Sequence, residues 1–475
     1  MIVTMDGARW GQALVWLLAY AAMCGWVLWR HRRAQQARSR QQGSLANAAA
    51  GTEATLVAYA SQTGQAEQLA WRTAELLHLA GASVRVCALD DVGLDELKRL
   101  SSIFLIASTY GEGDPPDNGA RFADHLATDA DHDWSHLRYG LLALGDRHYA
   151  QFCGFGRALD DWLGAHAAQP LFPRVDVDQM HDAAITTWFE QVAHVAGVAE
   201  LPAWQAPGFD EDGWQLAVRR HLNPGSPGEG VFHLELAPVH GAAPQWEAGD
   251  LVQVRPPLDA TRPADQQDLR PREYSIASIP RDARLHLLVR LRRLEDGGVG
   301  RVSGWLCEQA PLGQPLSLRV HAHSAFRVGE NTTRPLLLIG NGTGMAGLRA
   351  HIKARAEVHR EAGPSTPGCW LVFGERLPDV DLHHRDELAA WQAEGVLQRL
   401  DAVFSRCPQR PQYVQDRLRE RADEVRQWVG DGAAIYVCGS LAGMAAGVDE
   451  ALRAVLGDVQ LDQLARDGRY RRDVY

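Results

Sequence analysis

The sequence predicts a multidomain α/β protein: a doubly wound parallel sheet, then an antiparallel β-barrel, then a second parallel α/β domain, with one transmembrane helix at the start. Three observations predict this class. Apolar strand-like runs alternate with helical stretches over 52–200 and again over 334–475, which is typical of parallel sheets covered on both faces. Over 204–333, alternating strands are broken by Gly and Pro, which favours an antiparallel barrel. Residues 10–29 form one long apolar run.

The length and composition fit a globular protein of several domains. The chain has 475 residues, enough for about three domains of ordinary size. A hydrophobic content of 46% can fill sizeable cores, which argues against a disordered or multi-span membrane protein. The formal net charge of −11 argues against nucleic acid as a partner. The cysteines are scattered without C-x-x-C spacing, which indicates a reducing compartment rather than disulfides or a zinc site.

The N-terminal apolar run has the length of a membrane span. Residues 10–29 match a hydrocarbon core of about 30 Å. Tryptophans lie near both ends and basic residues follow at 30–40, so the positive-inside rule predicts an inner-membrane protein whose remaining domains face the cytoplasm. A cleaved signal peptide and a buried core helix are the alternatives, but the charges follow the run instead of preceding it. Residues 1–51 are therefore expected to be an anchor and a linker.

The expected elements follow the same three-part order. For the first parallel sheet, the pattern predicts strands at 55–60, 84–88, 103–108 and 139–145 and helices at 66–80, 95–100 and 156–166. For the barrel, it predicts strands at 231–239, 250–256, 284–291 and 315–320. For the last domain, it predicts strands at 335–340, 369–374, 397–405 and 433–439 and a helix at 348–362.

A polar segment with small residues follows the first expected strand directly and leads into a helix. Hydroxyls and free backbone N–H groups at a helix start can cradle a phosphate, and a glycine there permits a close approach. An ordinary helix N-cap has a similar sequence. The candidate phosphate-binding residues are Ser61, Gln62, Thr63, Gly64, Gln65 and Ala66.

Two later loops also follow expected strand ends, where open α/β sheets bind their ligands. A tyrosine in each loop, Tyr110 and Tyr149, can sandwich a flat aromatic ligand between them. The candidate residues are Ser108, Thr109, Tyr110, Gly111 and Gly113 in the first loop, and Leu144, Gly145, Asp146, Tyr149, Phe152 and Cys153 in the second.

These three stretches resemble the flavodoxin-like domain of diflavin reductases, the group that includes NADPH-haemoprotein reductase and the flavoprotein subunit of sulfite reductase. They are the segment at 61–67, STYGEGDPPDN at 108–118 and LGD-x-x-Y-x-x-F-C at 144–153, in the family's order and spacing. The resemblance implies that they bind the phosphate, the isoalloxazine ring and the ribityl side of FMN.

In the barrel region, Arg272, Tyr274 and Ser275 match the family's R-x-Y-S motif. The resemblance implies that the arginine pairs with the pyrophosphate of FAD, and that the tyrosine and serine meet its flavin. An exposed strand could carry Arg and Tyr for solubility alone, but a second loop resembles the family's other FAD phosphate loop, which opens a helix. That loop contains Gly300, Val302 and Ser303.

The last domain opens with a strand, a G-x-G-x-x-G turn at 342–347 and a helix, the pattern of a dinucleotide-binding loop. The resemblance implies an NADPH-binding domain of the ferredoxin-reductase type, although Asn341 replaces the family's proline. An arginine fork favours the 2′-phosphate of NADPH over NADH, but Pro411 stands where the family has lysine. The candidate residues are Gly342, Thr343, Gly344, Ser405, Arg406, Arg410, Tyr413 and Gln415.

Four residues are the catalytic candidates: Ser275, Cys438, Asp473 and Tyr475. The strand end at 436–444 resembles the family motif whose cysteine lies beside the nicotinamide, and the last residues resemble the end of the sulfite reductase flavoprotein. The resemblance implies that Tyr475 covers the FAD ring and moves before the nicotinamide stacks. It also implies that Asp473 assists hydride transfer with the serine and the cysteine.

The resemblance spans 52–475 and implies an NADPH-dependent diflavin oxidoreductase. Electrons would pass from NADPH to FAD, to FMN and to a one-electron acceptor, expected here to be a membrane-associated haem protein or metal reductase. The alternatives are the flavoprotein component of an NADPH sulfite reductase and a flavin-binding sensor without turnover. One departure is the missing helical connecting domain, since only 255–271 separates the two flanking motifs. We expect no metal site, because His321-x-His323 and His383-His384 lack neighbouring ligands.

Overall fold

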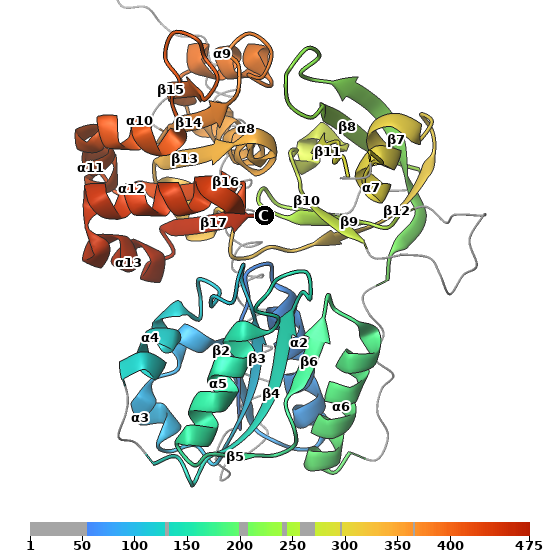
Figure 1. Ribbon diagram of the computed structural model, residues 1–475, viewed down its shortest axis with the longest axis vertical. Helices are drawn as coiled ribbons and strands as arrows, with labels where there is room; N and C mark the ends of the chain where they lie inside the picture. Colours follow the sequence, from blue (N-terminus) through green and yellow to red (C-terminus); the bar gives the residue numbers. More distant parts are fainter. Residues whose placement is uncertain are drawn as a thin grey trace, which may run out of the picture. The chain divides into compact units, whose positions relative to one another are not determined.

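The computed structural model describes residues 55–128, 133–198, 208–239, 245–256, 271–294, 297–363 and 366–475 (Figure 1). The chain divides into two compact units: the first comprises the residues up to Ser61 and 65–204, and the second comprises Gln62–Gly64 and 205–475. One β-sheet belongs to the first unit and two belong to the second. The predicted transmembrane helix at 10–29 lies outside the described residues. Among the helices of the described part, none has the length and apolar character to cross a bilayer.

The first unit is built on a parallel sheet with the strand order β2-β1-β3-β4-β5, in which β6 also pairs with β4 (Figure 1). Its strands are β1 (Thr55–Ala60), β2 (Val84–Ala88), β3 (Ser102–Ser108), β4 (Arg138–Gly145), β5 (Gln169–Pro170) and β6 (Val175–Asp178). Its helices are α2 (Gln65–Leu79), α3 (Leu94–Leu97), α4 (Ala120–Thr128), α5 (Gly154–Ala165) and α6 (Asp182–Ala196).

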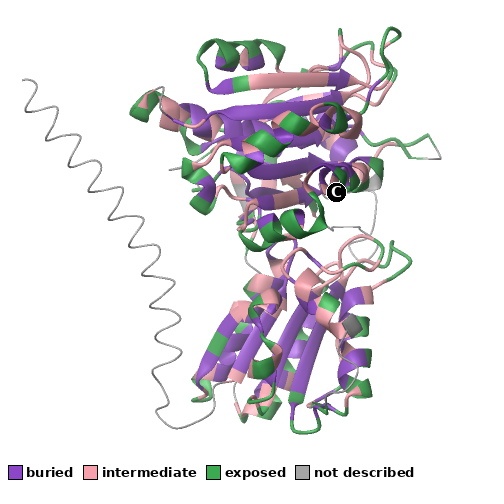
Figure 2. Cartoon of the chain, turned by 90° about the vertical axis from the view of Figure 1, so that its left-hand side faces the viewer, coloured by how far each residue is buried: buried purple, intermediate pink, exposed green. Residues whose placement is uncertain are grey.

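Helices cover both faces of this sheet, as the apolar strand runs predict. Val57 of β1 packs in a core cluster with residues of α2 and α6, whereas its neighbours Leu56 and Ala58 pack in a second cluster with residues of α5. This division follows from the alternation of side chains along a strand. The central strands β1, β3 and β4 are almost wholly buried (Figure 2). The doubly wound parallel sheet is therefore confirmed.

The second unit begins with an antiparallel sheet in the order β10-β9-β12-β7-β8-β11. Its strands are β7 (Asp210–His221), β8 (Val231–Pro238), β9 (Leu251–Val254), β10 (Arg272–Ser275), β11 (Leu285–Arg290) and β12 (Pro315–His321), with the short helix α7 (Arg301–Gly304). The antiparallel pairing agrees with the prediction. In the described residues the strand order runs from β10 to β11, and the N–H of Ala277, two residues after β10, donates to the carbonyl of His286 in β11 at 2.8 Å, so the two ends of the sheet approach each other.

A parallel sheet in the order β15-β14-β13-β16-β17 completes the second unit (Figure 1). Its strands are β13 (Leu336–Asn341), β14 (Cys369–Glu375), β15 (Leu397–Phe404), β16 (Ala434–Gly439) and β17 (Tyr470–Val474). Its helices are α8 (Met345–Ala362), α9 (Arg385–Ala393), α10 (Val414–Glu420), α11 (Ala422–Gly430), α12 (Ala446–Leu456) and α13 (Asp458–Arg466). The sequence pattern did not predict β17, which places the last residues of the chain against β16.

Candidate active site

The three predicted loops begin at one edge of the first unit's sheet. They follow β1, β3 and β4, which are neighbours in the strand order, and the carboxyl ends of parallel strands lie at a common edge. The backbone N–H of Thr109 donates to the carbonyl of Leu144 at 2.9 Å. The Thr109 hydroxyl accepts from the N–H of Phe155 at 3.3 Å. The loop after β3 is thereby tied to the end of β4.

The side chains at this edge differ in how free they are to bind a ligand. The Ser61 hydroxyl has no hydrogen-bond partner within the described residues, and the Tyr149 ring is exposed. Asp146, in contrast, accepts from the backbone N–H and the ring of His148 at 2.8 and 2.7 Å. Cys153 is fully buried and its thiol donates to a strand carbonyl. A hydroxyl without a partner and an open aromatic ring fit a phosphate-bearing flavin, whereas Cys153 serves the core.

Further candidates of this edge lie in the loops or at the strand and helix ends that flank them. Gln65 and Ala66 open α2, and Gly64, Gly111 and Gly113 have positive φ angles. Ser108, Leu144 and Gly145 end their strands.

In the second unit, β10 carries the predicted FAD motif. Arg272 is exposed, whereas Ser275 is buried. Tyr274 packs beside the core of the antiparallel sheet, and this burial raises its pKa. The Ser303 hydroxyl accepts from the N–H of Arg292 at 3.2 Å and donates to the carbonyl of Gly300 at 3.3 Å. That hydroxyl is therefore already engaged, which leaves the backbone of this loop as the candidate phosphate ligand.

Three of the four catalytic candidates meet in the second unit. The Ser275 hydroxyl donates to Asp473 Oδ2 at 2.7 Å, and the Cys438 thiol lies 3.6 Å from the same oxygen. Cys438 and Asp473 are register partners on β16 and β17, and Ser275 reaches them from β10. Burial, followed by the charge of Asp473, raises the pKa of the Cys438 thiol well above its ordinary value. The thiol therefore stays neutral beside the carboxyl group.

The fourth candidate, Tyr475, lies beside the glycine turn. Its N–H donates to the carbonyl of Gly439 at 3.0 Å, and its phenol donates to the Thr343 hydroxyl at 3.2 Å. The residue as a whole is 54% exposed, whereas burial raises the pKa of its phenol well above the ordinary value. The aromatic ring at the chain end thus lies next to a predicted NADPH loop.

A cavity of about 420 Å³ opens at the carboxyl edge of the second parallel sheet. The predicted residues Gly342, Ser405, Tyr413 and Gln415 line it. Arg406 is exposed and Arg410 forms an ion pair with Glu420 at 2.5 Å, and neither lines the cavity. The sequence argument missed several lining residues: Arg290, Asn341, Gly374, Glu375, Arg376, Gln412, Val414, Gly443 and Met444.

Comparison with known proteins agrees with this architecture. The chain matches the family described as flavodoxin over 57–190 and the family described as oxidoreductase NAD-binding domain over 338–450. It is similar to the sulfite reductase (NADPH) flavoprotein alpha-component of Neisseria meningitidis, with 28% identity over 99% of this chain and 96% of the relative. The same component of Vibrio cholerae is 27% identical over 91% of this chain and 89% of the relative. That of Bacillus subtilis is 25% identical over 90% of each.

The two domain matches and these relatives support the resemblance of the chain to the diflavin reductases. The chain is an NADPH-dependent oxidoreductase that uses FAD and FMN. The alternative of a flavin-binding sensor without turnover is therefore not retained. The alignment with the Neisseria meningitidis relative runs over 596 positions although this reductase has 475 residues, so a long stretch of the relative has no counterpart here. This difference agrees with the missing connecting domain.

The predicted inner-membrane location of the reductase is wrong. In the part of the chain that the structure describes, no helix could cross a bilayer. The relatives that align with nine-tenths of the chain or more are sulfite reductase flavoprotein components, with no membrane anchor in their description. The apolar run at 10–29 has the length expected of a transmembrane helix, but it lies outside the described residues. The names of these relatives also give no support to the expected membrane association of the acceptor.

Two of the missed cavity residues could have been found from the sequence, because they lie at or just after the carboxyl end of an expected strand. Glu375 ends β14, the strand that pairs with β13 before the glycine turn, and Arg376 follows it. Ligands of open α/β sheets bind at the carboxyl ends of such strands. Arg290 ends β11 in the other sheet of this unit, so only the packing of the two sheets brings it to the cavity.

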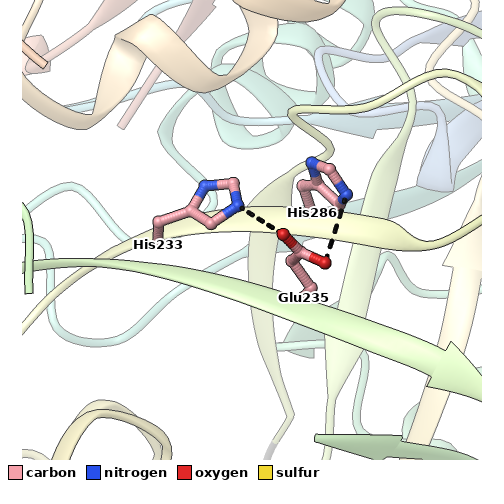
Figure 3. Close-up of side chains that lie close together, drawn as sticks. All are labelled: His233, Glu235 and His286. Carbon is pink, nitrogen blue, oxygen red and sulfur yellow. Dashed lines mark ion pairs between the residues drawn. The ribbon is translucent and has the colours of Figure 1, made fainter. Parts of the chain in front are cut away.

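A histidine cluster lies on β8 and β11 of the reductase (Figure 3). His233 Nε2 is 3.5 Å and His286 Nε2 is 4.0 Å from the carboxylate oxygens of Glu235. The spacing of these atoms would suit a metal ion, but Arg284 already donates to Glu235 at 2.7 Å. Arg349 Nη1 lies 3.3 Å from His286 Nδ1. One guanidinium group therefore contacts the carboxylate and another lies beside one imidazole. Because these positive charges repel a divalent cation, metal binding here is disfavoured.

Buried histidines make the stability of the reductase sensitive to mild acid. Burial, followed by neighbouring positive groups, lowers the pKa of His286 to about 3 and that of His351 to about 3, from 6.5. Because the folded-state pKa is depressed, this stability is present above pH 6.5 and is lost as the pH falls towards the folded-state value. Each such histidine can remove up to ~1.4 kcal/mol per pH unit.

We therefore expect the free energy of unfolding, measured with urea, to fall between pH 6.5 and 5, where carboxyl groups remain ionised. His351→Phe keeps a ring against Phe326 and Tyr436 and should reduce this loss by about 1–2 kcal/mol. The matched change His181→Phe at an exposed position should leave the loss unchanged. A variant at position 351 with the same pH dependence as the parent would contradict the assignment.

Proposed function

We propose that this reductase takes a hydride from NADPH beside Ser275, Cys438 and Asp473 and delivers electrons one at a time to a haem protein. The observation that carries the proposal is the meeting of these three side chains, from two sheets, in the unit that also holds the cavity of about 420 Å³. Asn341, which ends β13 and lines that cavity, accepts from the N–H of Ser440, two residues beyond Cys438. The cavity is therefore hydrogen-bonded to the chain just after β16, the strand that carries Cys438.

The cofactors are proposed to bind at the two edges described above. Bound FAD supplies a hydride acceptor and bound FMN a one-electron donor, while the protein supplies binding and orientation. In the first unit, the Ser61 hydroxyl and the backbone of its loop would hold the FMN phosphate, with Tyr149 against the ring. In the second unit, Arg272 would pair with the FAD pyrophosphate and Tyr274 would meet the flavin.

The proposed chemical role of Asp473 is electrostatic. NADPH gains a positive charge on its nicotinamide ring as the hydride leaves, and a preorganised carboxylate stabilises charge that develops in a transition state. The Ser275 hydroxyl orients this carboxylate. The Cys438 thiol, which keeps its proton, fills the space beside it without adding a second negative charge. Tyr475 would cover the flavin until the nicotinamide replaces it.

The 2′-phosphate of NADPH is proposed to bind at Ser405, with Tyr413 and Gln415 on the adenosine side of the cavity. Arg406 is exposed and has room to turn towards that phosphate. Arg410 would first have to leave Glu420. For this reason we assign the preference for NADPH to Ser405 and Arg406 rather than to Arg410.

The names of the relatives suggest which acceptor to test first. The similar proteins are flavoprotein components of NADPH sulfite reductase, so a sulfite-reducing haem protein is the favoured physiological acceptor. Cytochrome c is a suitable artificial acceptor because it takes one electron at an exposed haem edge.

Purified full-length protein should contain FAD and FMN in equal amounts and should reduce cytochrome c with NADPH. Addition of a sulfite-reducing haem protein should couple NADPH oxidation to sulfite consumption. Removal of FMN should abolish cytochrome c reduction but leave the reduction of ferricyanide, which FAD can serve directly. A preparation that stays colourless with both flavins supplied in excess, or that carries flavin but does not oxidise NADPH, would refute the proposal.

A further inference from the structure

A carboxylate lines the cavity that we assign to NADPH. Glu375 ends β14, and its side chain is only 6% exposed. Its Oε1 lies 3.5 Å from Arg290 Nη2 and 3.6 Å from His383 Nε2. Its Oε2 accepts from the backbone N–H of Arg376 at 3.0 Å. The carboxylate is therefore held in place by contacts on both oxygens.

This placement is unfavourable for an anionic ligand. A dinucleotide carries a pyrophosphate, and NADPH carries a further phosphate, so a buried carboxylate in the same cavity repels it. Glu375 also neutralises Arg290, whose side chain is 29% exposed and lines the cavity. The ion pair thus removes the positive charge that a phosphate would use.

Both partners of this ion pair face the glycine turn. A Cβ built on Gly342 would lie 2.6 Å from Arg290 Nη2 and 3.6 Å from Glu375 Oε1. Gly342 has a φ of +57°, so the turn is of a kind that brings backbone close to a ligand. Glycine turns between a strand and a helix bind the pyrophosphate of dinucleotides. The arginine is therefore within reach of the place where a pyrophosphate would bind.

We infer that Glu375 holds Arg290 before a dinucleotide binds and that the pyrophosphate of an incoming nicotinamide dinucleotide replaces the carboxylate as the partner of Arg290. This inference rests on the proposed function, because it takes the cavity to be the NADPH site. Glu375 is thereby an affinity-setting residue: it weakens dinucleotide binding and so favours release of the oxidised product. The exchange involves one ion pair for another, and no covalent bond changes.

Two other roles for Glu375 predict different results. Repulsion of the 2′-phosphate by Glu375 would weaken the binding of NADP⁺ alone, since NAD⁺ lacks that group. A hydrogen bond from the ribose 2′-hydroxyl, which acidic residues accept in many NAD-binding domains, would make Glu375 favourable for NAD⁺. Competition for Arg290 instead weakens the binding of NADP⁺ and of NAD⁺ by the same factor.

The test is calorimetric titration of the oxidised, flavin-loaded full-length protein with NADP⁺ and with NAD⁺. Glu375→Gln should lower the dissociation constant about tenfold for both. Glu375→Asp, which keeps the charge, should stay within about twofold of the parent. In an Arg290→Gln background, Glu375→Gln should lower the dissociation constants by only about twofold or less, because the Glu375 carboxylate then has no arginine to compete for.

Asp379→Asn serves as the matched control, since this acid lies four residues away and is exposed. It should leave both dissociation constants unchanged. Flavin content and the unfolding temperature of every variant show that the fold is kept. If the parent binds neither dinucleotide, the proposed function fails and the inference fails with it. Three results with a parent that binds would overturn only the inference. Glu375→Gln could bind both dinucleotides as the parent does or more weakly, or it could bind NADP⁺ alone more tightly. Glu375→Gln could also lower the dissociation constants as much in the Arg290→Gln background as in the parent.

Discussion

Asp473→Asn is expected to slow the reduction of the enzyme's FAD by NADPH about a hundredfold, with both flavins still bound. The substitution keeps the size of the side chain and an oxygen for the Ser275 hydroxyl, whose present distance is 2.7 Å. It removes the negative charge that opposes the positive charge developing on the nicotinamide. Stopped-flow bleaching of the flavin absorbance after mixing with NADPH measures this step directly.

The loss should appear in the rate and not in binding. An interaction that strengthens only in the transition state lowers kcat and kcat/KM together and leaves KM nearly constant. Asp467→Asn, at an exposed position six residues earlier, is the matched control and should bleach at the parent rate. A bleaching rate in Asp473→Asn within a factor of three of the parent would remove Asp473 from the catalytic group.

The strands of the parallel sheets could be predicted because each is encoded by a short, continuous run of apolar residues. The run Leu336–Ile339 is apolar at every position and is fully buried in β13, as expected of a parallel strand covered on both faces. The glycine turn that follows could be placed for the same reason. Helix α8 begins at Met345, three residues before the expected start, an error of the usual size at helix ends.

What could not be predicted depends on register and on packing between sheets. His286 lies opposite Glu235 only because β8 and β11 pair in that register. Arg290 reaches the cavity from a different sheet than Glu375 does. Strand β17 has the polar sequence YRRDV, which does not read as a strand, and its pairing with the buried β16 gives it that conformation. Ser275, Cys438 and Asp473 were expected together from the resemblance, whereas the distances between them depend on the fold.

Gly344→Ala is expected to destabilise the second unit by about 3 kcal/mol or more and to abolish NADP⁺ binding. A Cβ on this residue would lie 2.1 Å from the carbonyl oxygen of Cys438 and 2.7 Å from the Cα of Gly439. Both atoms are backbone of β16, so no side-chain rotation can relieve the overlap. Either β13 and β16 separate, or the turn moves away from the cavity.

The same overlap links this glycine to the catalytic group. Any shift of β16 that accommodates the methyl group moves Cys438 relative to Asp473, its register partner on β17. Gly430→Ala is the control, because a Cβ there meets no atom within 4 Å at the end of α11, and it should be neutral or stabilising by about 0.5–1 kcal/mol. Urea unfolding and NADP⁺ calorimetry of the two variants decide the matter. Equal unfolding midpoints and equal NADP⁺ affinities would mean that β16 can move at little cost, and that the close contact between turn and strand does not hold the catalytic side chains in place.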